Sequence, residues 1–248
     1  MEYRGDFLLG LIFGILWQSS VLVFATVLVS RFPGMGGWSR GEVLLIASMR
    51  LLSHALAVVA FHNLVLLPRT VQEGRIEGFL LRPMSVYRQV LLSRFHPNGL
   101  GDLCVALTLC ALALTSMNIS WTPARAGYAL AAVIGGTLLE GAVATALGSL
   151  ALRSPLAGPW WEWADEIMSV FGNYPLHILP KTVHAALTFV LPLAFVAYIP
   201  AAVLTGHANQ LLVPTWLALA SPLCGAAAFL LSLRLWRKGL RAYTGISG

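Results

Sequence analysis

The stretch RTVQEGRIEGFLLRPM, residues 69–84, is a short charged island between two long apolar runs. Its charged and apolar side chains alternate with a period near 3.6 residues, so we predict an amphipathic helix of about three turns that Pro83 ends. Gly74 and Gly78 each weaken an isolated helix by about 1 kcal/mol, so packing must supply its order. A basic loop that only fixes membrane orientation is the alternative.

The composition around this island indicates a membrane protein. The chain has 248 residues, of which 58% are hydrophobic and 10% charged, and its mean hydropathy is +0.77. One soluble core cannot hide that much apolar surface, and several runs have close to the ~20 residues that cross a bilayer. We therefore expect an all-α, polytopic fold with a single transmembrane domain, residues 1–248.

Six spans account for the apolar runs: residues 7–29, 43–67, 100–117, 127–150, 158–178 and 216–236. The fifth span has two candidates, 158–178 and 183–204, and hydropathy alone favours the second. Pro192 and Pro200 interrupt that second run, so it is also compatible with a broken, re-entrant helix packed against protein. Trp216 and Trp236 flank the last span and are expected at the two membrane faces.

The basic residues predict the orientation. Cytoplasmic connections carry an excess of Lys and Arg, and here nine lie in the island and tail against three in the alternate loops. Both termini and the island are therefore expected in the cytoplasm. The nine are Arg69, Arg75, Arg82, Arg88, Arg94, Arg234, Arg237, Lys238 and Arg241, and the three are Arg31, Arg40 and Arg125.

The sequence contains no motif for catalysis in this chain. It has no GxxxxGK[ST] loop to hold a nucleotide phosphate, and no HExxH or GxSxG motif, so we expect neither an enzyme nor a cofactor. The net charge is +6, but the basic residues form no patch interleaved with aromatic residues, which argues against a nucleic-acid partner. Cys104, Cys110 and Cys224 lie in apolar runs without ligand spacing, so no metal site is predicted.

Among the ionisable residues inside the predicted spans, three are candidates for a functional role: Arg50 and His54, four apart on one helical face, and Glu140. An ionisable group at that depth costs several kcal/mol unless it is paired or hydrated, and is therefore a candidate functional residue. We expect an Arg50–Glu140 pair that joins spans two and four, the alternative being a Glu140 that faces a translocation pathway. His54 is expected to be a hydrogen-bonded packing residue.

Five segments together carry a resemblance to the membrane subunits of type-2 ABC exporters. They cover nearly the whole chain in matching order, and the island is similar to the G-x-[LI]-[DE]-x-x-LLRP pattern of a poorly characterised bacterial branch. Such subunits usually have an amphipathic helix before span one, whereas only residues 1–6 precede it here. The segments are GGWSRGEVLLIAS (36–48), QEGRIEGFLLRP (72–83), NYPLHI (173–178), LTFVLPLAFVAYIPAAVLTG (187–206) and WRKGLRAYTG (236–245).

The resemblance implies a permease subunit in the inner membrane of a bacterium, which forms an efflux pathway with a second permease chain, identical or homologous. A separate nucleotide-binding ATPase, which holds ATP and Mg²⁺, would drive it through a cytoplasmic coupling helix at 69–84. A fifth span at 158–178 and an outer re-entrant hairpin at about 180–204 are also implied. The coupling residues would be Gly74, Ile76, Glu77, Phe79, Leu80, Leu81, Arg82 and Pro83.

Within the coupling helix, Ile76, Phe79 and Leu80 are expected to insert into the ATPase, with Glu73, Glu77 and Arg82 at the rim. Two other classes of function remain compatible with the sequence. An ion-coupled secondary transporter could use Glu140 with Arg50, although no inverted repeat accompanies them. A non-transporting membrane scaffold predicts no ATPase. The sequence does not specify the substrate.

Overall fold

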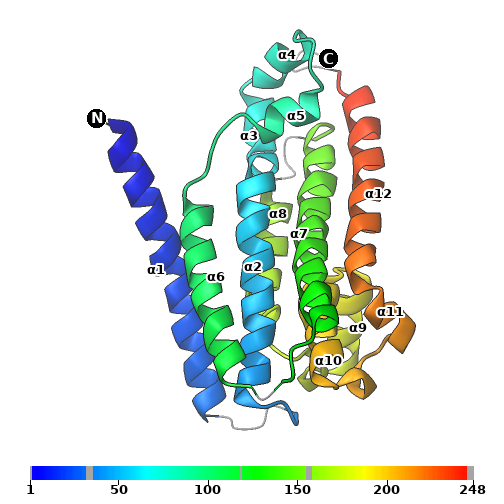
Figure 1. Cartoon of the computed structure of the whole chain (residues 1–248). Helices are drawn as coiled ribbons and strands as arrows, with labels where there is room; N and C mark the ends of the chain where they lie inside the picture. The colour runs from blue at the N-terminus through cyan, green and yellow to red at the C-terminus, as the bar shows by residue number, and fades with distance from the viewer. Residues whose placement is uncertain (1, 32–35, 118, 155–157, 245–248) are drawn as a thin grey trace.

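The computed structural model describes residues 2–31, 36–117, 119–154 and 158–244, and these residues form helices with no β-strand among them (Figure 1). The predicted all-α class is therefore confirmed. The α-helices are α1 (Glu2–Arg31), α2 (Arg40–Val65), α3 (Leu67–Gln72), α4 (Arg75–Leu80), α5 (Val86–Leu91), α6 (Asn98–Thr115), α7 (Pro123–Ala151), α8 (Gly158–Phe171), α9 (Lys181–Phe189), α10 (Tyr198–Thr205), α11 (Thr215–Leu219) and α12 (Ser221–Arg241). The 3₁₀ turns are η2 (Leu176–Ile178), η3 (Leu193–Phe195) and η4 (Ala208–Gln210).

Helix α2 is the centre of the bundle. Helices α6 and α1 follow it on one side, and α7 and α12 follow on the other (Figure 1). Small residues let α7 and α12 approach closely: a Cβ atom added at Gly225 would overlap the carbonyl oxygen of Gly135, and one added at Gly135 would lie 2.6 Å from Pro222 Cα. The packing of these two helices therefore depends on glycine.

The two longest buried helices begin at clear capping signals. The backbone N–H of Ser39 donates to Glu42 Oε2 (2.7 Å) and the Glu42 N–H donates to Ser39 Oγ (3.4 Å), which is a capping box at the start of α2. Thr122 accepts from the Arg125 N–H at the start of α7, where Pro123 occupies the first helical position. These caps fix where each helix begins.

Three helical segments in the described part of the chain are long and apolar enough to cross a membrane: Arg40–Gln72, which joins α2 and α3, Asn98–Thr115 and Pro123–Ala151. The predicted fifth span, 158–178, is α-helical only as far as Phe171, and the 3₁₀ turn η2 follows at Leu176–Ile178. At 14 residues α8 is about 21 Å long, short of the ~30 Å hydrocarbon core. The six crossings stay a prediction.

The segment from 180 to 205 is a broken helical hairpin at the end of the bundle opposite the island (Figure 1). Helix α9 ends at Phe189, the chain turns through Pro192 into η3, and α10 follows. Pro200 does not break this hairpin as predicted. It lies in the first turn of α10, where a backbone N–H has no acceptor within the helix, so proline is tolerated there.

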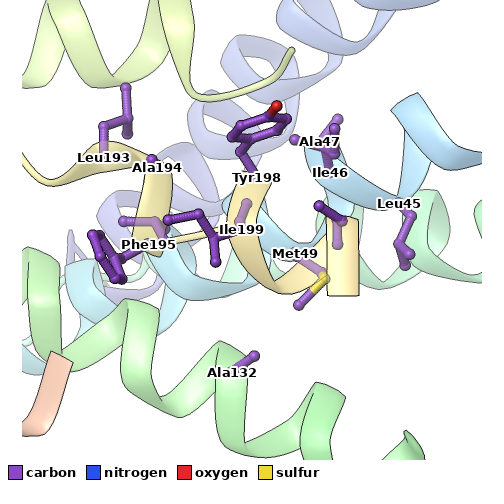
Figure 2. Packing of buried hydrophobic residues seen from close by; sticks show 14 of the residues in the cluster. Leu45, Ile46, Ala47, Met49, Ala132, Leu193, Ala194, Phe195, Tyr198 and Ile199 are labelled. Atoms are coloured by element: carbon purple, nitrogen blue, oxygen red, sulfur yellow. The ribbon is translucent and has the colours of Figure 1, made fainter. Parts of the chain in front are cut away.

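Two clusters of buried apolar side chains hold the bundle at its two ends. The first joins the hairpin to α2 and α7: Leu193, Phe195, Tyr198 and Ile199 pack among side chains of α2 such as Ile46 (Figure 2). The second joins the island to the rest of the chain. Its buried members are Ala57, Phe61, Leu64, Leu67, Val71, Ile76, Val86, Val90, Ala144, Leu152 and Trp236.

The two tryptophans expected at the membrane faces differ in exposure. Trp216 is exposed, but Trp236 is only 3% exposed and packs edge-on against Tyr87, with ring centroids 5.2 Å apart. Trp236 is thus a core residue that attaches α12 to the island. The start of α1 and the end of α12 both lie at the island end of the bundle (Figure 1).

Candidate functional site

The island forms two short helices, not the single three-turn helix expected from its periodicity. Helix α3 ends at Gln72, and α4 runs from Arg75 to Leu80. Between them Gly74 adopts φ 71°, a left-handed conformation that is readily available only to glycine. The glycine that lowers helix propensity in the sequence therefore serves as the turn between the two helices.

Burial separates the apolar residues of α4 into two groups. Ile76 is 0% exposed, within the island's own core cluster, and Phe79 packs partly against the same cluster. Leu80 is 47% exposed and Leu81 is 88% exposed. The expectation that Ile76 inserts into an ATPase is therefore wrong, because its side chain already holds the island together. Leu80 and Leu81 are free to meet a partner.

The charged residues of the island are exposed and partly paired with one another. Glu73 accepts from Arg69 Nε at 2.7 Å and lies 2.6 Å from Arg75 Nη2. The hydrogen bond from Arg69, assisted by the charge of Arg75, lowers the pKa of Glu73. Glu77, Arg82 and Pro83 are exposed. The pKa of Tyr243 is raised, first by burial and second by the negative charge of Glu77.

A cavity of about 890 Å³ lies beside α4, between the end of α2 and the connection from α5 to α6. The sequence contains no local signal for this cavity, because its walls come from segments about 30 residues apart. Its lining residues are Asn63, Leu66, Arg69, Thr70, Glu73, Gly74, Arg75, Gly78, Phe79, Arg82, Met84, Gln89, Leu92, Ser93 and Arg94.

Two buried amides hold the walls of this cavity in place. Asn63 Nδ2 donates to the carbonyl oxygens of Leu91 (2.9 Å) and Arg94 (2.7 Å), which fastens the α5–α6 connection to α2. Gln89 Nε2 donates to the carbonyl oxygens of Phe79 (2.8 Å) and Met84 (2.7 Å), which fastens the end of α4 to α5. The cavity is therefore a built feature of the fold.

The ionisable residues of the predicted spans form a buried cluster between α2 and α7. Arg50 Nη1 lies 3.0 Å from Glu140 Oε1, and both side chains are 2% exposed. His54 Nδ1 lies 2.9 Å from Glu140 Oε2. The Arg50–Glu140 pair expected from the sequence is present, and His54 has the hydrogen bond expected of a packing residue. Arg50 and His54 therefore each contact one of the two carboxylate oxygens of Glu140.

Neighbouring residues complete the surroundings of this cluster. A Cβ atom added at Gly172, just beyond α8, would lie 2.9 Å from Arg50 Nε, so this glycine leaves room for the guanidinium group. Asp102, which sequence analysis did not single out, is buried in α6 within electrostatic range of His54. Within the described residues no group of three or more His, Cys, Asp or Glu could hold a metal ion.

A second set of residues that sequence analysis missed closes the opposite end of the bundle. Trp38, only 1% exposed, donates from Nε1 to Gln210 Oε1 at 2.6 Å and stacks on His207 with ring centroids 4.4 Å apart. His207 Nε2 in turn lies 3.2 Å from Glu42 Oε1. Trp38 therefore fastens the start of α2 to the segment after the hairpin.

The helical fold, its membrane-capable helices and its buried ion pair define an α-helical membrane protein. The model of one protein family, described as "ABC-2 family transporter protein", matches residues 15–247 of this chain. The chain belongs to that family, which is a membrane component of ABC transporters and not a catalytic ATPase. No curated protein and no solved structure matches the chain significantly.

Proposed function

We propose that this chain is a permease subunit of an ATP-driven exporter and that a separate ATPase docks on α4. The observation that carries the proposal is the exposed Leu80–Leu81 pair on the island, at the end of the bundle where both chain ends lie (Figure 1). Exposed apolar side chains beside a charged rim are typical of a protein interface, where a few central residues supply most of the binding energy.

The core cluster of the island supports a role in force transmission. Val71 and Ile76 of the island pack with Leu64 and Leu67 at the end of α2 and with Trp236 of α12. Helix α2 continues into α3 with only Leu66 between them, in a near-helical conformation. A displacement of the docked α4 is therefore passed to two helices of the bundle.

Membership of the ABC-2 family supports the remaining parts of the proposed assembly. A second permease chain, identical or homologous, completes the substrate pathway, and the partner ATPase holds ATP and Mg²⁺. The excess of basic residues at the island and tail supports a cytoplasmic location for this end of the bundle, with the hairpin outside. The ion-coupled alternative would use Glu140, whose two carboxylate oxygens are both engaged by Arg50 and His54.

The docking proposal is tested by affinity purification of the full chain from its native membranes, followed by mass spectrometry and an ATPase assay. We expect an ATPase to co-purify with the unmodified chain, and its yield to fall about tenfold or more with Leu80→Ser, Leu81→Ser, because central interface residues are worth ~2 kcal/mol or more. Leu92→Ser is the control, since Leu92 is also exposed, at 77%, but follows α5 instead of α4. Equal recovery with both variants would reject α4 as the docking helix.

A further inference from the structure

The cavity beside α4 has the size of a ligand site. Its volume of about 890 Å³ lies within the ~300–1,000 Å³ range of small-molecule sites. Gly78 of α4 lines it, and a Cβ atom added at Gly78 would meet no atom within 4 Å. The cavity is thus open on this side, and no side chain of the described residues fills it.

The charge of the lining suits an anion. Four arginines line the cavity against a single carboxylate, Glu73, which leaves an excess of three positive charges. Arg69 and Arg75 share that carboxylate, whereas Arg82 and Arg94 have no carboxylate partner among the described residues. Guanidinium groups bind phosphate oxygens in a bidentate manner, so a phosphate group would match the two unpaired arginines.

The position of the cavity indicates the source of the phosphate. Asn63 and Leu66 of its lining lie at the end of α2, more than ~20 residues from the start of the membrane-capable segment Arg40–Gln72, so we infer that they reach the depth of the lipid headgroups. Leu92 in the lining is 77% exposed, and Phe95 beside it is also exposed. A basic cavity next to exposed apolar side chains, at the end of a membrane helix, has the chemistry of a lipid headgroup site.

We propose that this cavity binds the phosphate-bearing headgroup of an anionic phospholipid from the leaflet on the island side. Arg82 and Arg94 hold the phosphate, and the acyl chains leave the cavity over Leu92 and Phe95. The site requires only that α2 crosses the membrane. It is therefore independent of ATPase docking, and a test on the isolated chain separates the two proposals.

The test uses the detergent-solubilised full chain without any ATPase. Binding of dihexanoyl phosphatidylglycerol is measured by native mass spectrometry, with dihexanoyl phosphatidylcholine and inorganic phosphate as competing probes. We expect the anionic lipid to bind at least about tenfold tighter than either probe. The double variant Arg82→Gln, Arg94→Gln should weaken this binding about thirtyfold, from two lost cation contacts.

Two further variants test whether the cavity itself binds the lipid. Gly78→Leu places volume in the cavity without altering charge and should also reduce phosphatidylglycerol binding. Arg88→Gln removes an exposed arginine that does not line the cavity and should leave binding unchanged. Unchanged binding in the double arginine variant, equal binding of phosphatidylcholine, or equally tight binding of inorganic phosphate would each overturn the lipid site.

Discussion

Arg50 Nη1 and Glu140 Oε1 lie 3.0 Å apart in the interior of the bundle, joining α2 to α7. This distance is that of an ion pair. Neither atom has a hydrogen-bond partner in the described structure. Breaking a buried pair by removing one partner leaves an uncompensated charge and costs ~3–5 kcal/mol.

We expect Glu140→Gln to destabilise the chain by about 3–5 kcal/mol, and Arg50→Met by a similar amount, while the double variant loses far less than the sum. The measurement is unfolding in detergent micelles for all four members of the double-mutant cycle. Additive losses would show that the pair contributes no coupling energy and would leave Glu140 available to a translocation pathway.

Ile76 and Leu81 are expected to respond in opposite ways to truncation. Ile76→Ala opens a cavity in the island's core cluster and should cost about 2–5 kcal/mol of stability. Leu81→Ala removes an exposed side chain and should leave the melting temperature of the isolated chain within about 2 °C, because surface changes are usually within ±0.5 kcal/mol. A stability loss from Leu81→Ala equal to that from Ile76→Ala would contradict the orientation of α4.

Gly225 is expected to tolerate no side chain. Gly225→Ala forces α12 away from the Gly135 carbonyl and should cost about 1–3 kcal/mol through overpacking. Gly127→Ala is the matched control on α7, because a Cβ atom there meets nothing within 4 Å and alanine raises helix propensity. Thermal unfolding of the two variants distinguishes close packing from a general effect of replacing glycine in these helices.

The attachment of the α5–α6 connection should depend on pH. His96 Nε2 lies 3.0 Å from Asn63 Oδ1, and because the Asn63 amide nitrogen already donates twice, His96 is the donor. Burial first, and Arg94 second, lower the pKa of His96, whose ring also packs against that of His62. The attached connection therefore prefers neutral His96, so its stability is complete above pH ~6.5 and falls as the pH drops below that value.

Hydrogen exchange of residues 92–97 at pH 7.5 and pH 5.5 measures this effect. We expect faster intrinsic-rate-corrected exchange at pH 5.5 in the unmodified chain. His96→Gln keeps a donor for Asn63 but cannot take up a proton, so its exchange should change little between the two pH values. An equal pH response in His96→Gln would assign the effect to another group.

Single cysteines should report the two ends of the bundle on opposite sides of the membrane. Lys181 is exposed on the hairpin and Arg82 is exposed on the island. In a background with Cys104, Cys110 and Cys224 replaced, we expect Lys181→Cys to react with an impermeant maleimide from outside intact cells and Arg82→Cys only after lysis. Labelling of both positions from one side would restore 183–204 as a true span.

The sequence was sufficient for features whose signal is local in the chain. The apolar runs predicted α2, α6 and α7 closely, because length and hydropathy determine a membrane helix. The Arg50–Glu140 pair was also predictable, since each charge needed a partner at that depth. The turn at Gly74 was not predicted, because the helical period of charged and apolar residues continues across it. The glycine itself was the available signal for a turn.

Features that depend on distant segments could not be predicted. Trp38 and Trp236 have the composition signal of interfacial residues, yet both are buried by partners far along the chain, Gln210 and Tyr87. The cavity beside α4 likewise needs the α5–α6 connection, whose position is set by hydrogen bonds to Asn63. A hydropathy pattern contains no information on which segments meet.

The near-continuity of α2 and α3 has a mechanical consequence. Together they form a rod of 33 residues, about 50 Å long, from the capping box at Ser39 to the turn at Gly74. Arg50 and His54 anchor this rod to Glu140 partway along its length. If this rod pivots about Arg50 and His54, an inward movement at the island tilts Trp38 outward and pulls on His207 and Gln210, in the segment after the hairpin.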